Sequence, residues 1–352
     1  MANRWIGILV VSLAALAPPE GFAAGESVQS TGPEFSDCSI GTGAAQLVAQ
    51  CASLSVPLDP SVESGESLSL AIARIPARRR SSKTDALTLI AGGPGQSAIE
   101  SFPAVAFAFR HIMQDRDVIL VDQRGTGKSA KLDCPAAPDS IGLEFDVDLA
   151  SLEALAKDCF DSLENDPRLF STSIAVQDLE KVRESLGISQ WNIYGVSYGT
   201  RVALHYLRRY PDAVRTLILD AVVPPELALG PDIGPLAQRA LDLIFKRCFD
   251  ESGCADAFSD MDKATLTLLN KLEAEPRTIT YEDIASGKLA TMEFTRNHLA
   301  ITLRLMSYSS QTAAILPSML HEAIVNDNFA PLARQADLQT RSVGESLATG
   351  MH

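Results

Sequence analysis

Short apolar runs alternate with helically spaced segments over residues 51–225. Runs of about four to eight apolar residues without polar alternation are typical of strands buried on both faces of a sheet. The first two runs flank a turn rich in Asp, Pro, Ser and Gly, which favours an antiparallel pair. Residues 25–50 are polar and rich in Gly and Ser, which predicts an irregular lead-in. The predicted strands are 51–58, 68–75, 86–91, 117–121, 191–195 and 216–223, and the predicted helices are 173–186 and 198–210.

This alternation over short connections predicts the α/β class, with a mostly parallel sheet and helices on both of its faces. After residue 225 the pattern changes, because helical spacing dominates and no further buried strand is evident. We therefore expect a core over residues 25–225 and a helical cap over residues 226–343. The helices expected in the cap are 236–249, 262–272, 298–306 and 313–324.

The N-terminus has the features of a targeting segment. Arg4 precedes an apolar stretch over residues 5–17, and small residues over 21–24 offer a cleavage site. This order is typical of a signal peptide, here residues 1–24. The apolar stretch is short for a bilayer span, although a membrane-tethered anchor is an alternative. We expect an exported protein, periplasmic or extracellular, with no stable membrane span after signal cleavage.

Composition narrows the classes of function. The hydrophobic fraction of 46% is ample for a sizeable core. The net charge of −14 argues against a nucleic-acid partner, since phosphate binding needs a basic surface.

The six cysteines fall into three couples that are close in sequence. Disulfides are favoured over a metal site, because no Cys-x-x-Cys spacing or nearby histidine is present. No metal or organic cofactor is implied. The proposed couples are Cys38 with Cys51, Cys134 with Cys159, and Cys248 with Cys254.

Residues 195–199 read GVSYG, which places Ser197 in a Gly-x-Ser-x-Gly frame between a predicted strand and a predicted helix. This context is typical of a nucleophile elbow, in which a serine lies on a tight strand-to-helix turn. Glycine is needed on either side because a side chain would crowd the turn. We interpret Ser197 as a nucleophile; a chance match in a loop is the alternative.

A glycine-rich turn, GGPG at residues 92–95, directly follows another buried strand. In hydrolases with a nucleophile elbow, this loop supplies one backbone N–H of the oxyanion hole, and the residue after the serine supplies the other. The candidates are Gly93 and Tyr198. An ordinary Gly/Pro turn is the alternative.

Residues 125–129 (GTGKS) resemble part of a phosphate-binding loop, but Asp122 stands where that motif needs a glycine. We therefore reject nucleotide binding. Asp122 and Arg124 are expected to brace the loops around the site, with an exposed ion pair as the alternative.

In this architecture the base follows the nucleophile in the chain, and no histidine after Ser197 is well placed to serve as its general base. His205 lies eight residues along the following helix, roughly 12 Å from Ser197 along its axis. His298 and His321 fall in predicted cap helices, and His352 is the last residue. Neither a catalytic histidine nor a catalytic aspartate is identifiable.

Three motifs in this order, at residues 92–95, 122–125 (DQRG) and 195–200 (GVSYGT), resemble the proline iminopeptidase and tripeptidyl aminopeptidase branch of the α/β-hydrolases. The resemblance implies an α/β-hydrolase fold with a helical cap. It also implies an exported serine peptidase that releases short N-terminal peptides or proline through an acyl-enzyme, with a small peptide as substrate. Ala91 departs from the histidine that many iminopeptidases carry there.

In that family two more strands follow the cap, and the loops after them deliver the catalytic Asp and His. The resemblance therefore makes residues 344–352 the start of a truncated C-terminal part of the core. It implies that the 352-residue chain is weak or inactive, that its sixth core strand is an unpaired edge, and that a complementing chain exists if the gene is split. An esterase of the same fold and a non-catalytic exported peptide-binding remnant are the alternatives.

Overall fold

The computed structural model describes residues 32–62, 65–79, 83–130, 132, 149–228, 230–284 and 286–347. The predicted signal peptide lies outside these residues. None of the described helices is both long enough and apolar enough to cross a lipid bilayer.

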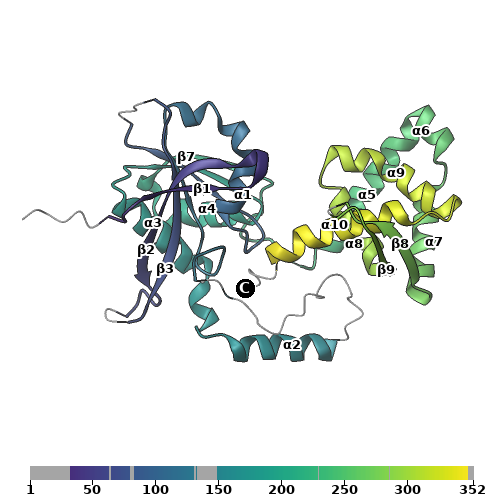
Figure 1. The fold of residues 1–352 in the computed structure, drawn as a ribbon, viewed down its shortest axis with the longest axis horizontal. Helices are drawn as coiled ribbons and strands as arrows, with labels where there is room; N and C mark the ends of the chain where they lie inside the picture. Colours follow the sequence, from purple (N-terminus) through teal and green to yellow (C-terminus); the bar gives the residue numbers. More distant parts are fainter. Residues whose placement is uncertain are drawn as a thin grey trace, which may run out of the picture. The chain divides into compact units, whose positions relative to one another are not determined.

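The core is built on a sheet that has seven strands in the described part of the chain, in the order β1-β2-β3-β5-β4-β6-β7 (Figure 1). The first three strands and β5 pair antiparallel, whereas β5, β4, β6 and β7 run parallel. The α/β prediction with a mostly parallel central sheet is confirmed. The strands are β1 (Ser36–Ile40), β2 (Leu47–Pro57), β3 (Ser67–Ile75), β4 (Ala86–Ile90), β5 (Val118–Val121), β6 (Trp191–Val196) and β7 (Val214–Asp220).

The order of strands places a switch point beside β4. From β4 the chain crosses to β5 on one side, and it later returns to β6 on the other side. In open α/β sheets, ligands bind beyond the carboxyl ends of the strands at such a point. The glycine-rich turn follows β4 and the Ser197 elbow follows β6. The topology therefore brings together two motifs that are far apart in sequence.

Helices cover both faces of this sheet, as the alternation predicted. On one face α1 (Ala98–Val105) packs through Phe102 against Leu87, Leu89 and other side chains of β4 and β5. On the other face α3 (Thr172–Ser185) and α4 (Tyr198–Arg209) pack against a second apolar cluster. Helix α2 (Leu149–Ser162) precedes α3.

The end of α3 shows how the sequence sets an element boundary. Gly187 has a φ of +64°, and its N–H donates to the Glu184 carbonyl at 3.0 Å. The N–H of Ile188 donates to the Arg183 carbonyl at 3.0 Å. This left-handed glycine cap ends the helix and directs the chain into β6.

The residues after β7 form a lobe with a hydrophobic core of its own. All four predicted cap helices are present, each within a few residues of its expected bounds. The lobe contains α5 (Ile233–Asp250), α6 (Ser252–Ala257), α7 (Met261–Ala274), α8 (Arg296–Met306), α9 (Ser310–Val325) and α10 (Ala330–Leu347).

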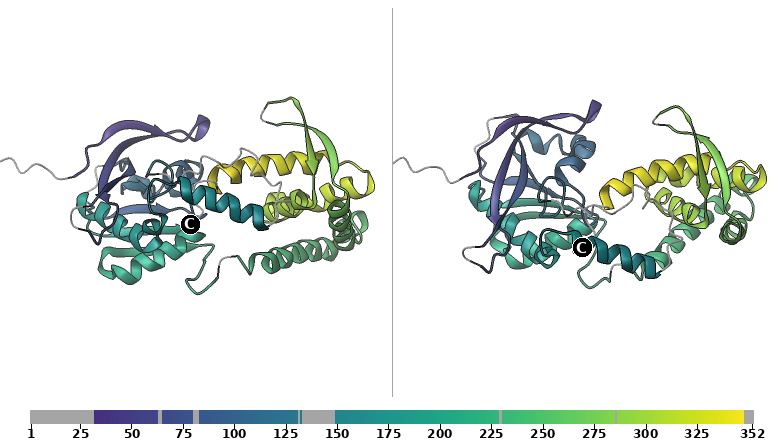
Figure 2. Two further views of the ribbon diagram at one scale, coloured as in Figure 1. Left: turned by 90° about the horizontal axis from the view of Figure 1, so that it is seen from below. Right: turned by 60° about the horizontal axis from the view of Figure 1, so that its bottom comes forward.

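Two features of this lobe differ from the prediction. An antiparallel hairpin of β8 (Arg277–Glu282) and β9 (Leu289–Phe294) lies among the helices, and β8 packs against α10 (Figure 2). Its strands alternate exposed and half-buried positions, so they lack the continuous apolar runs of a buried strand. The boundary expected at residue 343 falls inside α10. The division into core and cap stays a prediction.

The prediction of an irregular lead-in over residues 25–50 is wrong, because part of this segment forms strands. β1 and the first residues of β2 lie within residues 25–50, and they pair so that Cys38 faces Ala49. Most of their residues are exposed or half-buried, so polar side chains are tolerated and hide the strand pattern.

Two of the three proposed disulfides are present. Cys38 is bonded to Cys51 across β1 and β2, and Cys248 is bonded to Cys254 between α5 and α6. Cys159 is disulfide-bonded, but Cys134 lies outside the described residues. Their pairing stays a prediction.

The last strand of the sheet, β7, is open on one side. Among the strands that the structure describes, it pairs with β6 alone. Ile218 in this strand is 48% exposed and Val222 just after it is 53% exposed. The expected unpaired apolar edge is therefore observed.

Candidate active site

Ser197 lies on a sharp turn between β6 and α4. Its backbone has φ +55° and ψ −124°, a region that residues with a side chain seldom occupy. Its side chain makes no capping hydrogen bond to the helix that it starts, and the residue is half-buried. A strained serine with an uncommitted hydroxyl at a strand-to-helix turn is the geometry of a nucleophile elbow.

The two glycines of the motif are required by close backbone contacts. A Cβ on Gly195 would lie 2.7 Å from the Gly199 carbonyl oxygen. A Cβ on Gly199 would lie 2.1 Å from the Ile90 carbonyl oxygen at the end of β4. Both distances are far below a van der Waals contact, and the obstructing atoms are backbone. Glycine therefore lets α4 start directly over β4.

Neighbouring segments hold the strained turn in place. The Ser197 N–H donates to the Asp220 carbonyl at 2.9 Å, which ties the elbow to the end of β7. The Thr200 hydroxyl donates to the Ser197 carbonyl at 2.6 Å and accepts the Val223 N–H at 2.8 Å. A backbone strain of about 1–3 kcal/mol persists only where such surroundings over-determine it. Thr200 was not predicted as a site residue, although it ends the GVSYGT motif.

The glycine-rich turn after β4 lies against the elbow. A Cβ on Gly92 would be 2.9 Å from Ser197 Cβ and 3.2 Å from the Val196 carbonyl oxygen. Gly93 has a φ of +105°, and its N–H donates to no acceptor among the described residues. Tyr198 is the first residue of α4, where helix geometry leaves the N–H without an intrahelical partner. The fold thus brings Gly93 and Tyr198 to the surroundings of Ser197, and their role as oxyanion donors stays a proposal.

Asp122 holds the segment after the glycine-rich turn through hydrogen bonds to its carboxylate. Its carboxylate is 1% exposed and accepts the Ser97 hydroxyl at 2.7 Å and the Ile99 N–H at 3.1 Å. It also accepts the Lys128 N–H at 3.1 Å. Ser97 is the N-cap of α1 and directly follows the turn, so Asp122 links this turn to the loop after β5. The expected bracing role is observed.

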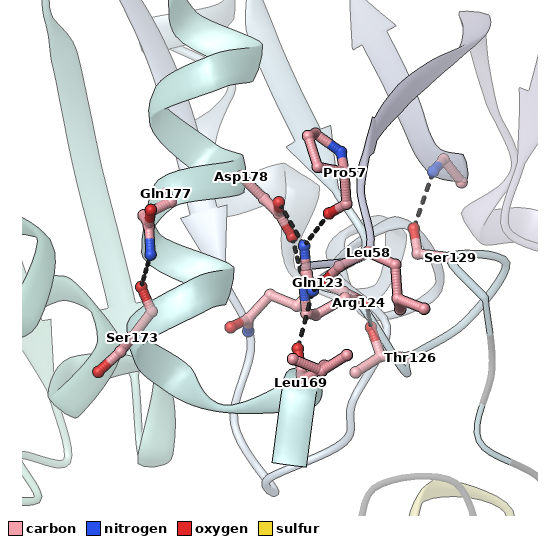
Figure 3. A network of polar contacts seen from close by, with 11 residues as sticks. Pro57, Leu58, Gln123, Arg124, Thr126, Ser129, Leu169, Ser173, Gln177 and Asp178 are labelled. Carbon is pink, nitrogen blue, oxygen red and sulfur yellow. Dashed lines mark hydrogen bonds and ion pairs between the residues drawn. The ribbon is translucent and has the colours of Figure 1, made fainter. Parts of the chain in front are cut away.

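Arg124 joins three other segments of the core: the end of β2, the segment before α3, and α3 itself (Figure 3). Its Nε and Nη2 donate to the two carboxylate oxygens of Asp178 on α3 at 2.6 and 2.8 Å. Its remaining donors reach backbone carbonyls of Leu58, Leu169 and Pro57, at 2.8, 2.7 and 3.1 Å.

Arg124 is only 2% exposed, so the alternative of an exposed ion pair is wrong. Burial raises the pKa of the Asp178 carboxyl, although the Arg124 guanidinium opposes this shift.

Residues 125–129 form a tight turn of their own. The Gly125 N–H donates to the Ser129 carbonyl at 2.8 Å, and the Ser129 hydroxyl accepts the Ala71 N–H at 2.8 Å. These hydrogen bonds stabilise the turn and join it to β3, and the rejection of nucleotide binding stays a prediction.

A pair that the sequence did not indicate lies under the elbow. The Tyr194 hydroxyl on β6 donates to the carboxylate of Asp220, the residue whose carbonyl holds Ser197. This hydrogen bond raises the pKa of Tyr194 to about 12. The pair joins a side chain of β6, three residues before Ser197 in the sequence, to one of β7.

The three described histidines that follow Ser197 in the sequence lie on helices of the core and of the lobe after β7. His205 lies on α4 with its Nδ1 beside Arg208, and burial together with that guanidinium lowers the pKa of His205. His298 forms a capping box with Thr295 at the start of α8, and the His321 ring packs on Phe258. His352 lies outside the described residues. Over the described ranges, no group of three or more His, Cys, Asp or Glu side chains is arranged to hold a metal ion.

Comparison with known proteins agrees with this geometry. Residues 85–244 match the family model of the alpha/beta hydrolase fold, a range that includes β4 to β7, the glycine-rich turn and the elbow. This part of the chain is similar to proteins of the alpha/beta hydrolase fold. A solved α/β-hydrolase from Novosphingobium aromaticivorans matches 70% of this chain and 68% of its own, at 13% identity and a TM-score of 0.33.

Curated proteins similar to this chain include two peptidases and an esterase. The chain is 31% identical over 211 residues to a tripeptidyl aminopeptidase of Streptomyces lividans, covering 55% of this chain and 39% of that protein. It is 31% identical over 191 residues to serine protease Hip1 of Mycobacterium tuberculosis, covering 50% of this chain and 36% of that protein. A carboxylesterase B of M. tuberculosis is 29% identical over 215 residues, covering 54% of this chain and 39% of its own length.

The chain thus spans well under half the length of these relatives. The similarities agree with a serine hydrolase lineage, since the curated relatives include a tripeptidyl aminopeptidase and a serine protease.

Proposed function

We propose that Ser197 is the nucleophile of a serine peptidase that removes short peptides from a free N-terminus. The observation that carries this proposal is the strained, half-buried Ser197 at the start of α4, with the glycine-rich turn packed against it. The similarity to a tripeptidyl aminopeptidase supports the peptide class of substrate.

In the proposed chemistry, Ser197 Oγ attacks the scissile carbonyl carbon and the carbonyl π electrons move onto the oxygen. The N–H groups of Gly93 and Tyr198 stabilise this oxyanion, helped by the positive end of the α4 dipole. In the collapse of the tetrahedral intermediate the C–N bond breaks and the leaving nitrogen takes up the proton released by Ser197. The amine departs and an acyl-enzyme remains, which water then hydrolyses.

The hydroxyl proton of Ser197 must pass to a base during attack. In the described part of the chain, neither a histidine nor a carboxylate is hydrogen-bonded to the Ser197 hydroxyl. We therefore propose that the 352-residue chain alone turns over slowly, with only the residual rate that oxyanion donors and binding provide.

A fluorophosphonate probe with mass-spectrometric mapping tests the nucleophile. We expect adduct on Ser197, none in Ser197→Ala, and unchanged labelling in Ser173→Ala, which removes an exposed hydroxyl on α3. A folded wild-type chain that takes up no probe during long incubation would contradict the proposal and favour a non-catalytic peptide-binding remnant.

An esterase is the second candidate, because a carboxylesterase is among the curated relatives. The same nucleophile and oxyanion donors serve both reactions, so the fold alone does not select between them. A tripeptide nitroanilide and a nitrophenyl ester, compared at equal concentration, separate the two. Turnover of the ester alone would move the assignment to an esterase.

Export and a protein partner complete the proposal. Disulfides persist in oxidising compartments, so Cys38–Cys51 and Cys248–Cys254 support a periplasmic or extracellular location. The open edge of β7 supports pairing with a strand of a complementing chain. Detection of the protein in the cytoplasm alone, with reduced cysteines, would count against export.

A further inference from the structure

Gln96 closes the glycine-rich turn against itself. The Gly92 N–H donates to Gln96 Oε1 at 3.2 Å, and the Gln96 N–H donates to the Gly92 carbonyl at 3.3 Å. This pair of bonds joins the first residue of the turn that carries Gly93 to the residue that directly follows the turn. Because Oε1 accepts from Gly92, the amide nitrogen Nε2 is left as the free end of the side chain.

The Gln96 amide lies on the side of Gly92 that meets the nucleophile. A single point, the position of a Cβ on Gly92, is 2.9 Å from Ser197 Cβ and 3.4 Å from Gln96 Oε1. The side-chain amide of Gln96 and the base of the Ser197 side chain therefore flank the same small space.

The amide nitrogen is available to a ligand. No acceptor for Gln96 Nε2 is present among the described residues, and the side chain is half-buried rather than enclosed. An amide held at one end and free at the other is pre-oriented, so it can donate without a large loss of side-chain entropy.

We propose that Gln96 Nε2 donates a third hydrogen bond to the oxyanion formed at Ser197, beside the N–H groups of Gly93 and Tyr198. This inference rests on the proposed function of Ser197. Side-chain amides serve as oxyanion donors in acyl transfer, and the loss of one donor typically lowers the rate by about 10²–10³-fold. Gln96 is then a catalytic residue that also fixes the turn carrying Gly93.

Two substitutions separate the donor from the turn-closing acceptor. Gln96→Glu keeps an oxygen for the Gly92 N–H but replaces the Nε2 donor with an acceptor. Gln96→Met removes both groups without adding charge. Gln311→Glu is the matched control, because its Oε1 also accepts hydrogen bonds at an exposed site in the cap.

The measurement is the rate of fluorophosphonate labelling of Ser197 from pH 3.5 to 8, with circular dichroism to confirm folding. In this reaction the Oγ–P bond forms, fluoride leaves with the electrons of the P–F bond, and the hydroxyl proton passes to base or water. At pH 7 we expect both Gln96 variants to label at least about tenfold more slowly than wild type, and Gln311→Glu to match wild type.

Labelling rates at the acidic end of the pH range test whether a hydrogen-bond donor at residue 96 is needed. Below the ordinary carboxyl pKa of about 4.3, the Glu side chain regains an O–H donor. The rate of Gln96→Glu relative to wild type should then rise, whereas that of Gln96→Met should stay low. A role confined to closing the turn predicts no such recovery.

Three results would overturn the inference while leaving Ser197 as nucleophile: wild-type rates in Gln96→Glu, wild-type rates in Gln96→Met, or no acid recovery in a slow Gln96→Glu. An unlabelled wild-type chain would overturn the proposed function, and this inference with it.

Discussion

Close backbone contacts around Ser197 decide which residue types fit at individual positions. The carbonyl oxygen of Ile90 occupies the space that a side chain at residue 199 would need, and the strained backbone of Ser197 depends on that close approach. At Arg124, one buried guanidinium donates hydrogen bonds to a carboxylate and to three backbone carbonyls. Substitutions at these positions therefore have specific expected costs.

Gly199→Ala should destabilise the elbow. The added methyl group would meet the Ile90 carbonyl oxygen at 2.1 Å, and backbone cannot move aside as a flexible side chain does. We expect a loss of about 1–3 kcal/mol in the free energy of unfolding, with much reduced probe labelling of Ser197. Gly234→Ala in α5 is the control, since nothing lies within 4 Å of its added methyl group. Equal urea midpoints for the two variants would contradict this account.

Arg124→Met should be among the most damaging single changes in the core. It leaves the buried Asp178 carboxylate without its cation and frees three backbone carbonyls. Removing one partner of a buried ion pair typically costs about 3–5 kcal/mol.

Urea unfolding of Arg124→Met can be compared with Arg168→Met, which removes an exposed ion pair with Asp166 and should stay close to wild type. The double variant Arg124→Met/Asp178→Leu should recover part of the loss. A double variant no more stable than Arg124→Met would show that the unpaired carboxylate is not the cause.

At the scale of elements, one carboxylate joins the start of the parallel strands. Asp85, just before β4, accepts hydrogen bonds from Arg116 at 2.6 Å and from Asn192 of β6 at 2.8 Å, and Arg215 of β7 is 3.8 Å away. The site is built at the opposite, carboxyl ends of these strands. Asp85 therefore stabilises the frame of the site without touching it.

This arrangement predicts a pH dependence of stability. Burial alone would raise the pKa of Asp85, but the hydrogen bonds from Arg116 and Asn192 outweigh it, so the pKa is lowered. A lowered pKa in the folded state gives stability that is complete above the unfolded value of about 3.9 and is lost as the pH falls through the folded value.

Asp85→Asn should therefore be less stable than wild type at pH 7, and the difference should shrink below about pH 4. Urea midpoints measured from pH 3 to 7 provide the test. Asp115→Asn, at an exposed pair with Arg79, should follow wild type over the same range. A difference for Asp85→Asn that stays constant with pH would be the contrary result.

The sequence predicts strands well where burial on both faces requires a continuous run of apolar residues. The runs that became β4, β5 and β6 are buried along most of their length, so their apolar pattern is unbroken. Strand β1 and the hairpin of β8 and β9 were missed because their exposed positions accept polar residues.

At the site, motif spacing located Ser197 and the glycine-rich turn. The contacts of Gln96 and the bond between Tyr194 and Asp220 depend on tertiary packing that no local pattern encodes.

At the scale of the whole molecule, the open edge of β7 is the main liability. Parallel strands are normally buried, yet Ile218 is 48% exposed on β7, which pairs with β6 alone among the described strands. Exposed apolar edges template pairing with other chains. We expect the purified chain to self-associate as its concentration rises.

Ile218→Lys should reduce that association, because a charge on an edge strand opposes edge-to-edge pairing. Val48→Lys is the control, since Val48 is 82% exposed but lies on β2, between β1 and β3. Sedimentation velocity over a range of concentrations measures the effect. If both lysine variants lower association equally, general surface charge rather than the β7 edge is responsible.

The Arg124 clamp also bears on the order of folding. Its bonds join residues that are 45 to 67 positions apart in the chain. Contacts that close such long loops form only after their entropy cost has been met, so we expect the clamp to be largely absent from the folding transition state. Arg124→Met should then accelerate unfolding and leave the refolding rate nearly unchanged in stopped-flow measurements. The clamp would set how long the folded site lasts, not how fast it is reached.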